Sequence, residues 1–192
     1  MNRYAIWALA LVFCAGLFAQ EFTLGSKVTD FQLTDVNGKT VQLASLKGGV
    51  TVLMFIATQC PVSNAYNERM QAVYRDYSGK GVKFIGINSN NTEPAPEVAA
   101  HRQENGFGFE VYKDPGNAVA DRFAAGVTPE IFVLDKGGVI RYHGYIDDSQ
   151  KPENIKKQGL RPALDEMLGG KAVTLAETKA FGCTIKRVKK AS

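Results

Sequence analysis

The sequence has few of the residues that form metal centres and no sign of a nucleic-acid-binding surface. Its 192 residues include three cysteines, two histidines and one tryptophan, and the formal net charge is +4. His101 and His143 lie far apart and lack metal-ligand spacing, so we expect no bound metal. A charge this small gives no reason to expect nucleic acid as a partner. The chain also lacks a glycine-rich phosphate loop, and we expect no cofactor.

Long apolar runs are absent except at the N-terminus. There, Arg3 precedes a stretch from Ala5 to Ala19 that carries no charge. A positive start followed by a short apolar run is typical of a secretory signal peptide, whereas a membrane-spanning helix needs about 20 apolar residues. We therefore predict a signal peptide over residues 1–20 and export to the periplasm or cell envelope of a bacterium. A leader that is retained, and that attaches the protein to the membrane, is the alternative.

The rest of the chain has the length of one domain. Strand patterns and helix patterns alternate along it, which predicts an α/β fold with a mixed sheet between helices. Continuous apolar stretches predict buried strands, and Asn-Gly between two short alternating segments predicts a hairpin. The strands are expected at 31–33, 41–43, 50–56, 82–88, 107–112, 130–134 and 139–146, and the helices at 61–77, 94–104, 117–124 and 160–168. We predict one domain over residues 21–192, with a C-terminal tail without clear periodicity from about residue 171.

Cys60 lies where the strand 50–56 leads into a helix that begins with Pro61. Proline suits the first helical turn, because that position needs no amide hydrogen. The unpaired amides and the positive dipole end at a helix N-terminus favour a thiolate, which is the nucleophilic form of cysteine. We therefore predict that Cys60 is a reactive nucleophile. A buried structural cysteine is the alternative.

The segment from Phe55 to Ser63 resembles the thioredoxin active site, in which a strand ending in Phe-x-Ala leads to Cys-x-x-Cys. Here the motif is Cys-x-x-Ser, with Cys60 in the attacking position and Ser63 in place of the second cysteine. The segment 126–129, Gly-Val-Thr-Pro, is similar to the cis-proline loop of that superfamily. The resemblance implies that Thr128 and Pro129, together with Pro61, border an extended substrate.

Two further segments resemble one branch of the thioredoxin-like superfamily. Residues 28–48 are similar to the N-terminal extension of the alkyl-hydroperoxide-reductase/TSA-like (redoxin) branch, and residues 182–186 are similar to a bacterial subgroup of it. The residues that carry the likeness are Val28, Phe31, Leu33, Asp35, Gly38, Leu46, Lys47 and Gly48, and then Gly182, Cys183, Ile185 and Lys186. The resemblance implies a three-layer thioredoxin-like fold with an N-terminal β-hairpin extension.

Cys183 is the only other cysteine outside the leader, because Cys14 lies within it. Ser63 cannot form a disulfide, so a mixed disulfide on Cys60 must be resolved by Cys183 or by an external thiol. The leading hypothesis is therefore an exported thiol–disulfide oxidoreductase that acts on protein or small-molecule disulfides and is recycled by an external thiol reductant. The alternatives are a structural disulfide between the two cysteines and an inert Cys183 that takes no part in the chemistry.

Two other functions stay open at this point. A peroxiredoxin-like peroxidase would oxidise Cys60 with peroxide and condense the sulfenic acid with Cys183. Val52 and Ala57 stand where the peroxiredoxin pattern has proline and threonine, which disfavours this reading. A non-catalytic binding module with a locking disulfide is the third function. Elsewhere, the acidic pair Asp147–Asp148 is interpreted as part of a solvated loop.

Thiol counting tests the two-cysteine hypothesis. We expect the mature protein to contain a Cys60–Cys183 bond that opens in mild reductant, and each of Cys60→Ser and Cys183→Ser to expose one thiol. Alkylation against pH should show that Cys60 titrates below about 8.5, the ordinary cysteine value. Two free thiols, with Cys60 titrating as an ordinary cysteine, would contradict the hypothesis.

Overall fold

A computed structural model describes residues 21–189 of the chain. The predicted signal peptide, residues 1–20, lies outside the described residues. Its cleavage and the limits of the domain stay predictions. Within residues 21–189, none of the helices has the length and hydrophobicity of a membrane span.

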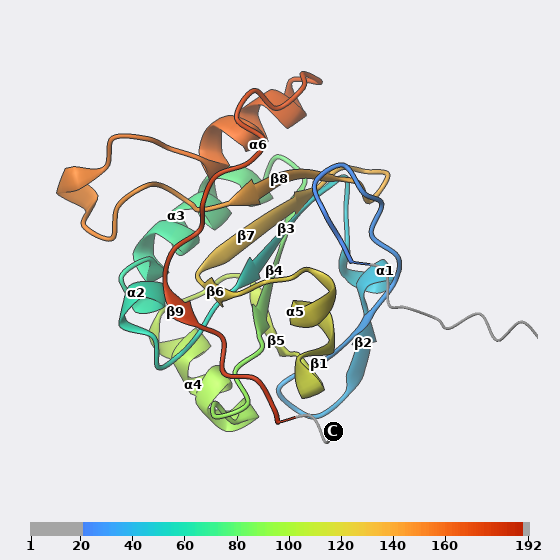
Figure 1. Cartoon of the computed structure of the whole chain (residues 1–192), viewed down its shortest axis with the longest axis vertical. Helices are drawn as coiled ribbons and strands as arrows, with labels where there is room; N and C mark the ends of the chain where they lie inside the picture. Colours follow the sequence, from blue (N-terminus) through green and yellow to red (C-terminus); the bar gives the residue numbers. More distant parts are fainter. Residues whose placement is uncertain (1–20, 190–192) are drawn as a thin grey trace, which may run out of the picture.

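The centre of the molecule is a mixed sheet of seven strands in the order β2-β1-β5-β4-β3-β7-β8 (Figure 1). β3 pairs in parallel with β4 and antiparallel with β7, and β4 pairs in parallel with β5. The predicted N-terminal hairpin is present and extends the sheet through pairing of β1 with β5. The strands are β1 (Gln32–Thr34), β2 (Thr40–Gln42), β3 (Val50–Phe55), β4 (Val82–Asn88), β5 (Glu110–Lys113), β7 (Glu130–Leu134) and β8 (Ile140–Gly144). A separate pair is formed by β6 (Val127–Thr128) and β9 (Cys183–Thr184).

Helices cover both faces of the sheet and give it three layers. The helices are α1 (Leu43–Leu46), α2 (Pro61–Asn64), α3 (Asn67–Ser78), α4 (Ala95–Glu104), α5 (Ala118–Arg122) and α6 (Leu160–Leu168), with 3₁₀ turns at η1 (Pro115–Asn117) and η2 (Pro152–Asn154). Alternate residues of β3 enter different cores: Val52 and Met54 join the α3 and α6 side, while Leu53 and Phe55 join the α5 side. Burial on both faces explains why this strand reads as one apolar run.

The helix predicted over 61–77 is instead two helices, α2 and α3, separated at Ala65 and Tyr66. The amide of Tyr66 bonds the carbonyl of Ser63 at 3.0 Å, which is a tighter turn than that of an α-helix. The Tyr66 ring is buried, and its hydroxyl donates to the carbonyl of Asp147 at 3.1 Å. A contact with a distant loop therefore interrupts the helix, and the spacing of apolar residues carries no sign of it.

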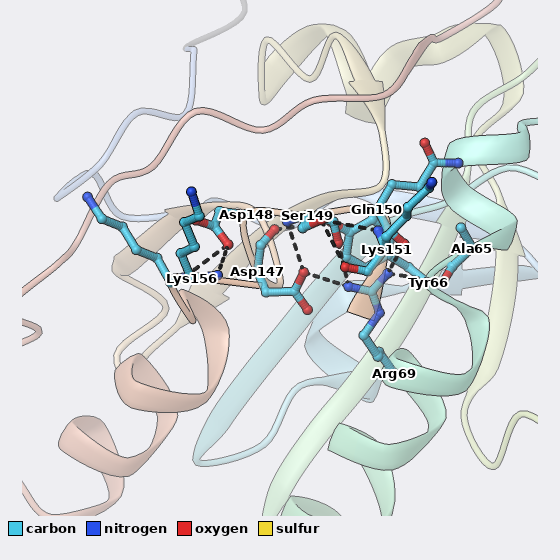
Figure 2. A network of polar contacts seen from close by, with 10 residues as sticks. Ala65, Tyr66, Arg69, Asp147, Asp148, Ser149, Gln150, Lys151 and Lys156 are labelled. Atoms are coloured by element: carbon cyan, nitrogen blue, oxygen red, sulfur yellow. Dashed lines mark hydrogen bonds and ion pairs between the residues drawn. The ribbon is translucent and has the colours of Figure 1, made fainter. Parts of the chain in front are cut away.

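The interpretation of Asp147 as a solvated residue is wrong, because Asp147 is only 1% exposed. Its carboxylate accepts a hydrogen bond from Arg69 at 2.6 Å, and Arg69 also donates to the carbonyls of Ser149 and Gln150 at 2.7 and 2.8 Å (Figure 2). The Arg69 guanidinium lies 3.7 Å from the centre of the Tyr66 ring. These contacts attach the loop after β8 to the junction of α2 and α3.

Asp148, the other half of the acidic pair, belongs to the loop surface. Its carboxylate accepts the backbone amides of Lys156 and Lys157 at 2.8 and 3.0 Å. These two hydrogen bonds hold the pKa of Asp148 below its usual value. Two adjacent aspartates therefore have different roles, one in a buried ion pair and one in a loop turn.

The buried ion pair gives a stability prediction. Replacing Asp147 with alanine leaves the Arg69 guanidinium without its carboxylate, so we expect the free energy of unfolding to fall by about 3 kcal/mol. Urea unfolding of the oxidised protein measures this loss. The exposed neighbour Lys151 is the matched control, because only its backbone bonds Ser149. Lys151→Ala should change stability by less than about 0.5 kcal/mol, and an equal loss in both variants would contradict the assignment.

Candidate active site

Cys60 lies at the N-terminus of α2, as predicted, directly after the loop that follows β3. Its backbone is extended, and its Sγ accepts the amide of Ser63 at 3.2 Å. Pro61 occupies the first helical position and is exposed. Because α2 has only four residues, the local amide of Ser63, rather than the dipole of a long helix, faces the sulfur. Cys60 is 4% exposed.

Ser63 is buried and serves the turn before the helix. Its hydroxyl accepts the backbone amide of Ala57 at 3.1 Å. The side chain that replaces the second cysteine of the motif therefore joins the end of β3 to α2. This position contributes a structural hydrogen bond to the turn.

The loop at Thr128 and Pro129 faces Cys60. The peptide bond between these two residues is cis, which confirms the prediction for Pro129. The carbonyl oxygen of Thr128 lies 3.4 Å from Cys60 Sγ. The structure thus brings together two segments that are 68 residues apart in the chain.

Cys183 forms a disulfide with Cys60, with the two Cα atoms 5.8 Å apart. It lies on β9, which pairs antiparallel with β6 so that Cys183 is opposite Thr128 and Thr184 is opposite Val127. Figure 1 shows this red segment crossing the molecule beside α2 and β6. The tail that lacked periodicity therefore returns to the predicted nucleophile.

The residues after Cys183 hold the tail in place. Ile185 is 3% exposed, and its amide bonds the carbonyl of Gly126 at 3.0 Å. The amide of Lys186 donates to the side-chain oxygen of Asn90 at 2.7 Å, and Arg187 pairs with Asp121 at 2.9 Å. These contacts join the C-terminal tail to the loop after β4, to α5 and to the residue before β6.

A buried carboxylate contacts the loop that precedes Cys60, and it was not predicted from the sequence, where Glu93 lies between the predicted strand 82–88 and the predicted helix 94–104. Glu93 is 1% exposed and accepts the backbone amides of Thr58 and Gln59 at 2.9 and 3.1 Å. Its other hydrogen-bond donors are the side-chain amides of Asn88 and Asn90. Burial by itself raises the pKa of Glu93, but these hydrogen bonds outweigh it and hold the pKa below the usual value. One indication of this contact was available: the loop directly follows β4, and the end of β4 lies beside the end of β3.

Charged groups also surround this carboxylate. Lys113 donates to Asn88 and to the carbonyls of Asn90 and Glu93, and burial lowers its pKa. Glu97 accepts the hydroxyl of Thr58. The loop before Cys60 is thus attached to β4, β5 and α4 through polar side chains.

The two histidines are placed apart from one another. His101 contacts the side chain of Asn64 at 2.9 Å, and burial lowers its pKa. His143 pairs at 2.7 Å with Glu130, the residue after Pro129. Among residues 21–189, no group of three or more metal-binding side chains is placed to hold an ion.

A cysteine at a helix N-terminus after a central strand, opposite a cis-proline loop and bonded to a second cysteine, defines a thioredoxin-like oxidoreductase. Residues 24–143 match the AhpC/TSA family, and the chain belongs to that family. The resemblance found in the sequence is thereby confirmed.

Solved structures support the fold over most of the chain. An uncharacterized conserved protein from Geobacillus kaustophilus is 32% identical with a TM-score of 0.82, covering 88% of this chain and 95% of its own. A hypothetical protein from Sinorhizobium meliloti 1021 is 32% identical with a TM-score of 0.80, covering 89% of this chain and 98% of its own.

A relative found by sequence carries a functional name. The protein named thiol-disulfide oxidoreductase ResA of Bacillus anthracis is 29% identical over 135 residues, which is 69% of this chain and 77% of the relative.

The Glu93 carboxylate gives the prediction for this site. In Glu93→Gln one oxygen becomes an amide that faces hydrogen-bond donors, so we expect the free energy of unfolding at neutral pH to fall by about 1–3 kcal/mol. Since the folded pKa is lowered, the contribution of Glu93 is present above its ordinary value of 4.5 and is lost as the pH falls through the folded value.

Urea unfolding as a function of pH measures both effects, and the variant should lose part of the acid dependence. Glu97→Gln is the matched control, because Glu97 is less buried and accepts from side chains rather than from the backbone. Glu97→Gln should lower the free energy of unfolding by less than Glu93→Gln does. An acid dependence that stays unchanged in Glu93→Gln would refute the assignment.

Proposed function

We propose that the protein is a thiol–disulfide oxidoreductase of the bacterial cell envelope, in which Cys60 attacks and Cys183 resolves. The observation that carries this proposal is the bond between these cysteines beside the Thr128–Pro129 loop. The similarity to proteins named thiol-disulfide oxidoreductase ResA supports the activity. The uncharged N-terminal stretch supports export.

The proposed reaction begins with the reduced protein. The Cys60 thiolate attacks one sulfur of a substrate disulfide, the other substrate sulfur leaves as a thiolate, and a mixed disulfide forms on Cys60. The Cys183 thiolate then attacks Cys60 Sγ, which releases the second substrate thiolate and leaves the Cys60–Cys183 bond. An external thiol reductant supplies the two electrons that open this bond again.

The surrounding residues have supporting roles in this proposal. The amide of Ser63 faces Cys60 Sγ and favours its thiolate, because an N–H donor stabilises the charged form. Thr128 and Pro129 border the substrate opposite the sulfur, and Pro61 borders it at the start of α2. Ser63 has no redox role because it carries no thiol, and its hydroxyl accepts the amide of Ala57.

The contacts of Thr58 favour disulfide exchange over peroxide reduction. The Thr58 hydroxyl donates its hydrogen to Glu97, so it is not free to donate to a peroxide at Cys60. Val52 and Ala57, which stand at the peroxiredoxin pattern positions, are buried apolar side chains. Peroxide consumption by the reduced protein should accordingly be slow.

Trapping tests the proposal. Incubated with a small-molecule disulfide such as bis(2-hydroxyethyl) disulfide, reduced Cys183→Ser should accumulate a mixed disulfide on Cys60, seen by mass spectrometry, while the wild type releases reduced product. Cys60→Ser should form no adduct, and its rate of disulfide reduction should fall by about a hundredfold or more, because the nucleophile is absent. Activity retained in Cys60→Ser, or peroxide consumption faster than disulfide reduction, would reject the proposal.

A further inference from the structure

The strand that carries Cys183 occupies the edge of β6 that faces Cys60. The resemblance already implies an extended substrate at the Thr128–Pro129 loop. We propose that this substrate is a peptide that takes the place of β9 in the same register, with glycine directly before its cysteine, and that β9 competes with it inside the protein. The inference rests on the proposed function and names the substrate class of that site. Three observations support the inference: the position of the sulfur bonded to Cys60, the backbone pairing of β9 with β6, and the space around Gly182 and Ile185.

The position of the substrate sulfur follows from the disulfide geometry. A sulfur bonded to Cys60 stands about 2 Å from Cys60 Sγ. In the structure that place is taken by Cys183, and Cys60 is almost completely buried. A substrate cysteine therefore has to replace Cys183 at this position.

The backbone next to that position belongs to β6. Thr128 lies opposite Cys183, and the carbonyl of Gly126 accepts the amide of Ile185 at 3.0 Å. Among the described residues, β6 pairs with β9 alone. An incoming peptide obtains the same hydrogen bonds by adding to this edge as an antiparallel strand, once β9 has left.

Gly182, the residue before the cysteine, has no space for a side chain. A Cβ atom there would overlap the carbonyl oxygen of Thr128 and would lie 3.3 Å from the nitrogen of Pro129. Both neighbours are backbone atoms, so no rotamer change relieves the overlap. The conformation of Gly182 is not in the left-handed region, and the glycine is therefore required by space. A peptide in the same register must also have glycine before its cysteine.

Ile185, two residues after the cysteine, is buried in the core on the α5 side of the sheet. Thr184, between them, is exposed. Alternation along the strand thus requires an apolar residue at the second position after the cysteine and accepts any residue at the first. The recognition pattern is Gly-Cys-x-apolar.

Contacts beyond the disulfide keep β9 in competition after reduction. Lys186 bonds Asn90 and Asn91 through its backbone, and the Arg187 guanidinium donates to the carbonyl of Ala125 at 2.6 Å. These contacts do not depend on the bond between the cysteines. Since β9 and the peptide use one edge, the return of Cys183 to Cys60 also displaces the peptide backbone. Resolution of the mixed disulfide and release of the product are then a single event.

Peptide capture tests the inference in Cys183→Ser, where Cys60 is the reactive thiol of the mature chain. The probes are a peptide with the sequence of residues 180–186, Ala-Phe-Gly-Cys-Thr-Ile-Lys, and the same peptide with alanine in place of glycine. Each carries its cysteine as a disulfide with 2-thiopyridine. Attack on the peptide sulfur releases pyridinethione and leaves the peptide on Cys60, and mass spectrometry measures the rate of this adduct.

We expect the glycine peptide to form the adduct at least about tenfold faster than the alanine peptide, because overpacking against backbone is costly. Adding Ile185→Ala should raise the rate by about tenfold or more, since it weakens the docking of β9. Arg187→Ala, an exposed position, should raise the rate several-fold without removing core volume. Circular dichroism shows whether each variant is folded.

The outcomes separate this inference from the proposed function. Equal rates for the two peptides, with Cys60 reacting readily with 2,2′-dithiodipyridine, would overturn the glycine requirement and leave the oxidoreductase proposal intact. Unchanged rates in both Ile185→Ala and Arg187→Ala would overturn the competition by β9. A Cys60 that reacts with neither peptide nor with dithiodipyridine would refute the proposed function itself.

Discussion

The position of β3 between one parallel and one antiparallel neighbour is the constraint on which the site depends. Phe55, the last residue of β3, lies opposite Ile87 of β4 and opposite Glu130 of β7. A parallel neighbour ends where β3 ends, whereas an antiparallel neighbour begins there. The loop with Glu93 follows β4, and the loop with Pro129 precedes β7. Three segments distant in sequence therefore meet around Cys60 because of strand direction alone.

The backbone amides around Cys60 are divided among specific acceptors. Ala57 donates to the Ser63 hydroxyl, and Thr58 and Gln59 donate to Glu93, whereas the amide of Ser63 donates to the sulfur. Buried amides need partners, and here the partners also fix the path of the loop. The negative charge of Glu93 is compensated by these donors, so a carboxylate is accommodated beside a cysteine that has to carry negative charge.

Local patterns in the sequence predict the parts of this arrangement that depend on neighbouring residues. The strand before Cys60 and the helix start at Pro61 each follow from a few adjacent positions, whereas the cis bond at Pro129 was implied by the resemblance of residues 126–129 to a cis-proline loop. Cys183 illustrates what such patterns leave open, because its pairing with Thr128 is long-range and its strand has only two residues. Tyr66 and Asp147 are similar cases, since burial of a tyrosine against a distant loop interrupts a helix that looks continuous. Glu93 was missed because the burial of its carboxylate depends on backbone amides of the loop after β3, which is distant in sequence.

The disulfide has a consequence for the whole fold as well as for the site. It joins residues 123 positions apart, so the bonded chain is a ring that contains β4, β5, β7 and β8. Closing a loop of this length removes entropy from the unfolded chain, worth about 5 kcal/mol in the chain-entropy description. By thermodynamic linkage, the folded protein holds its two sulfurs together more strongly than the unfolded chain does, by the same amount. Reduction therefore lowers the stability of the folded domain at the same time as it frees the nucleophile, and the reduced form of the protein is the less stable form.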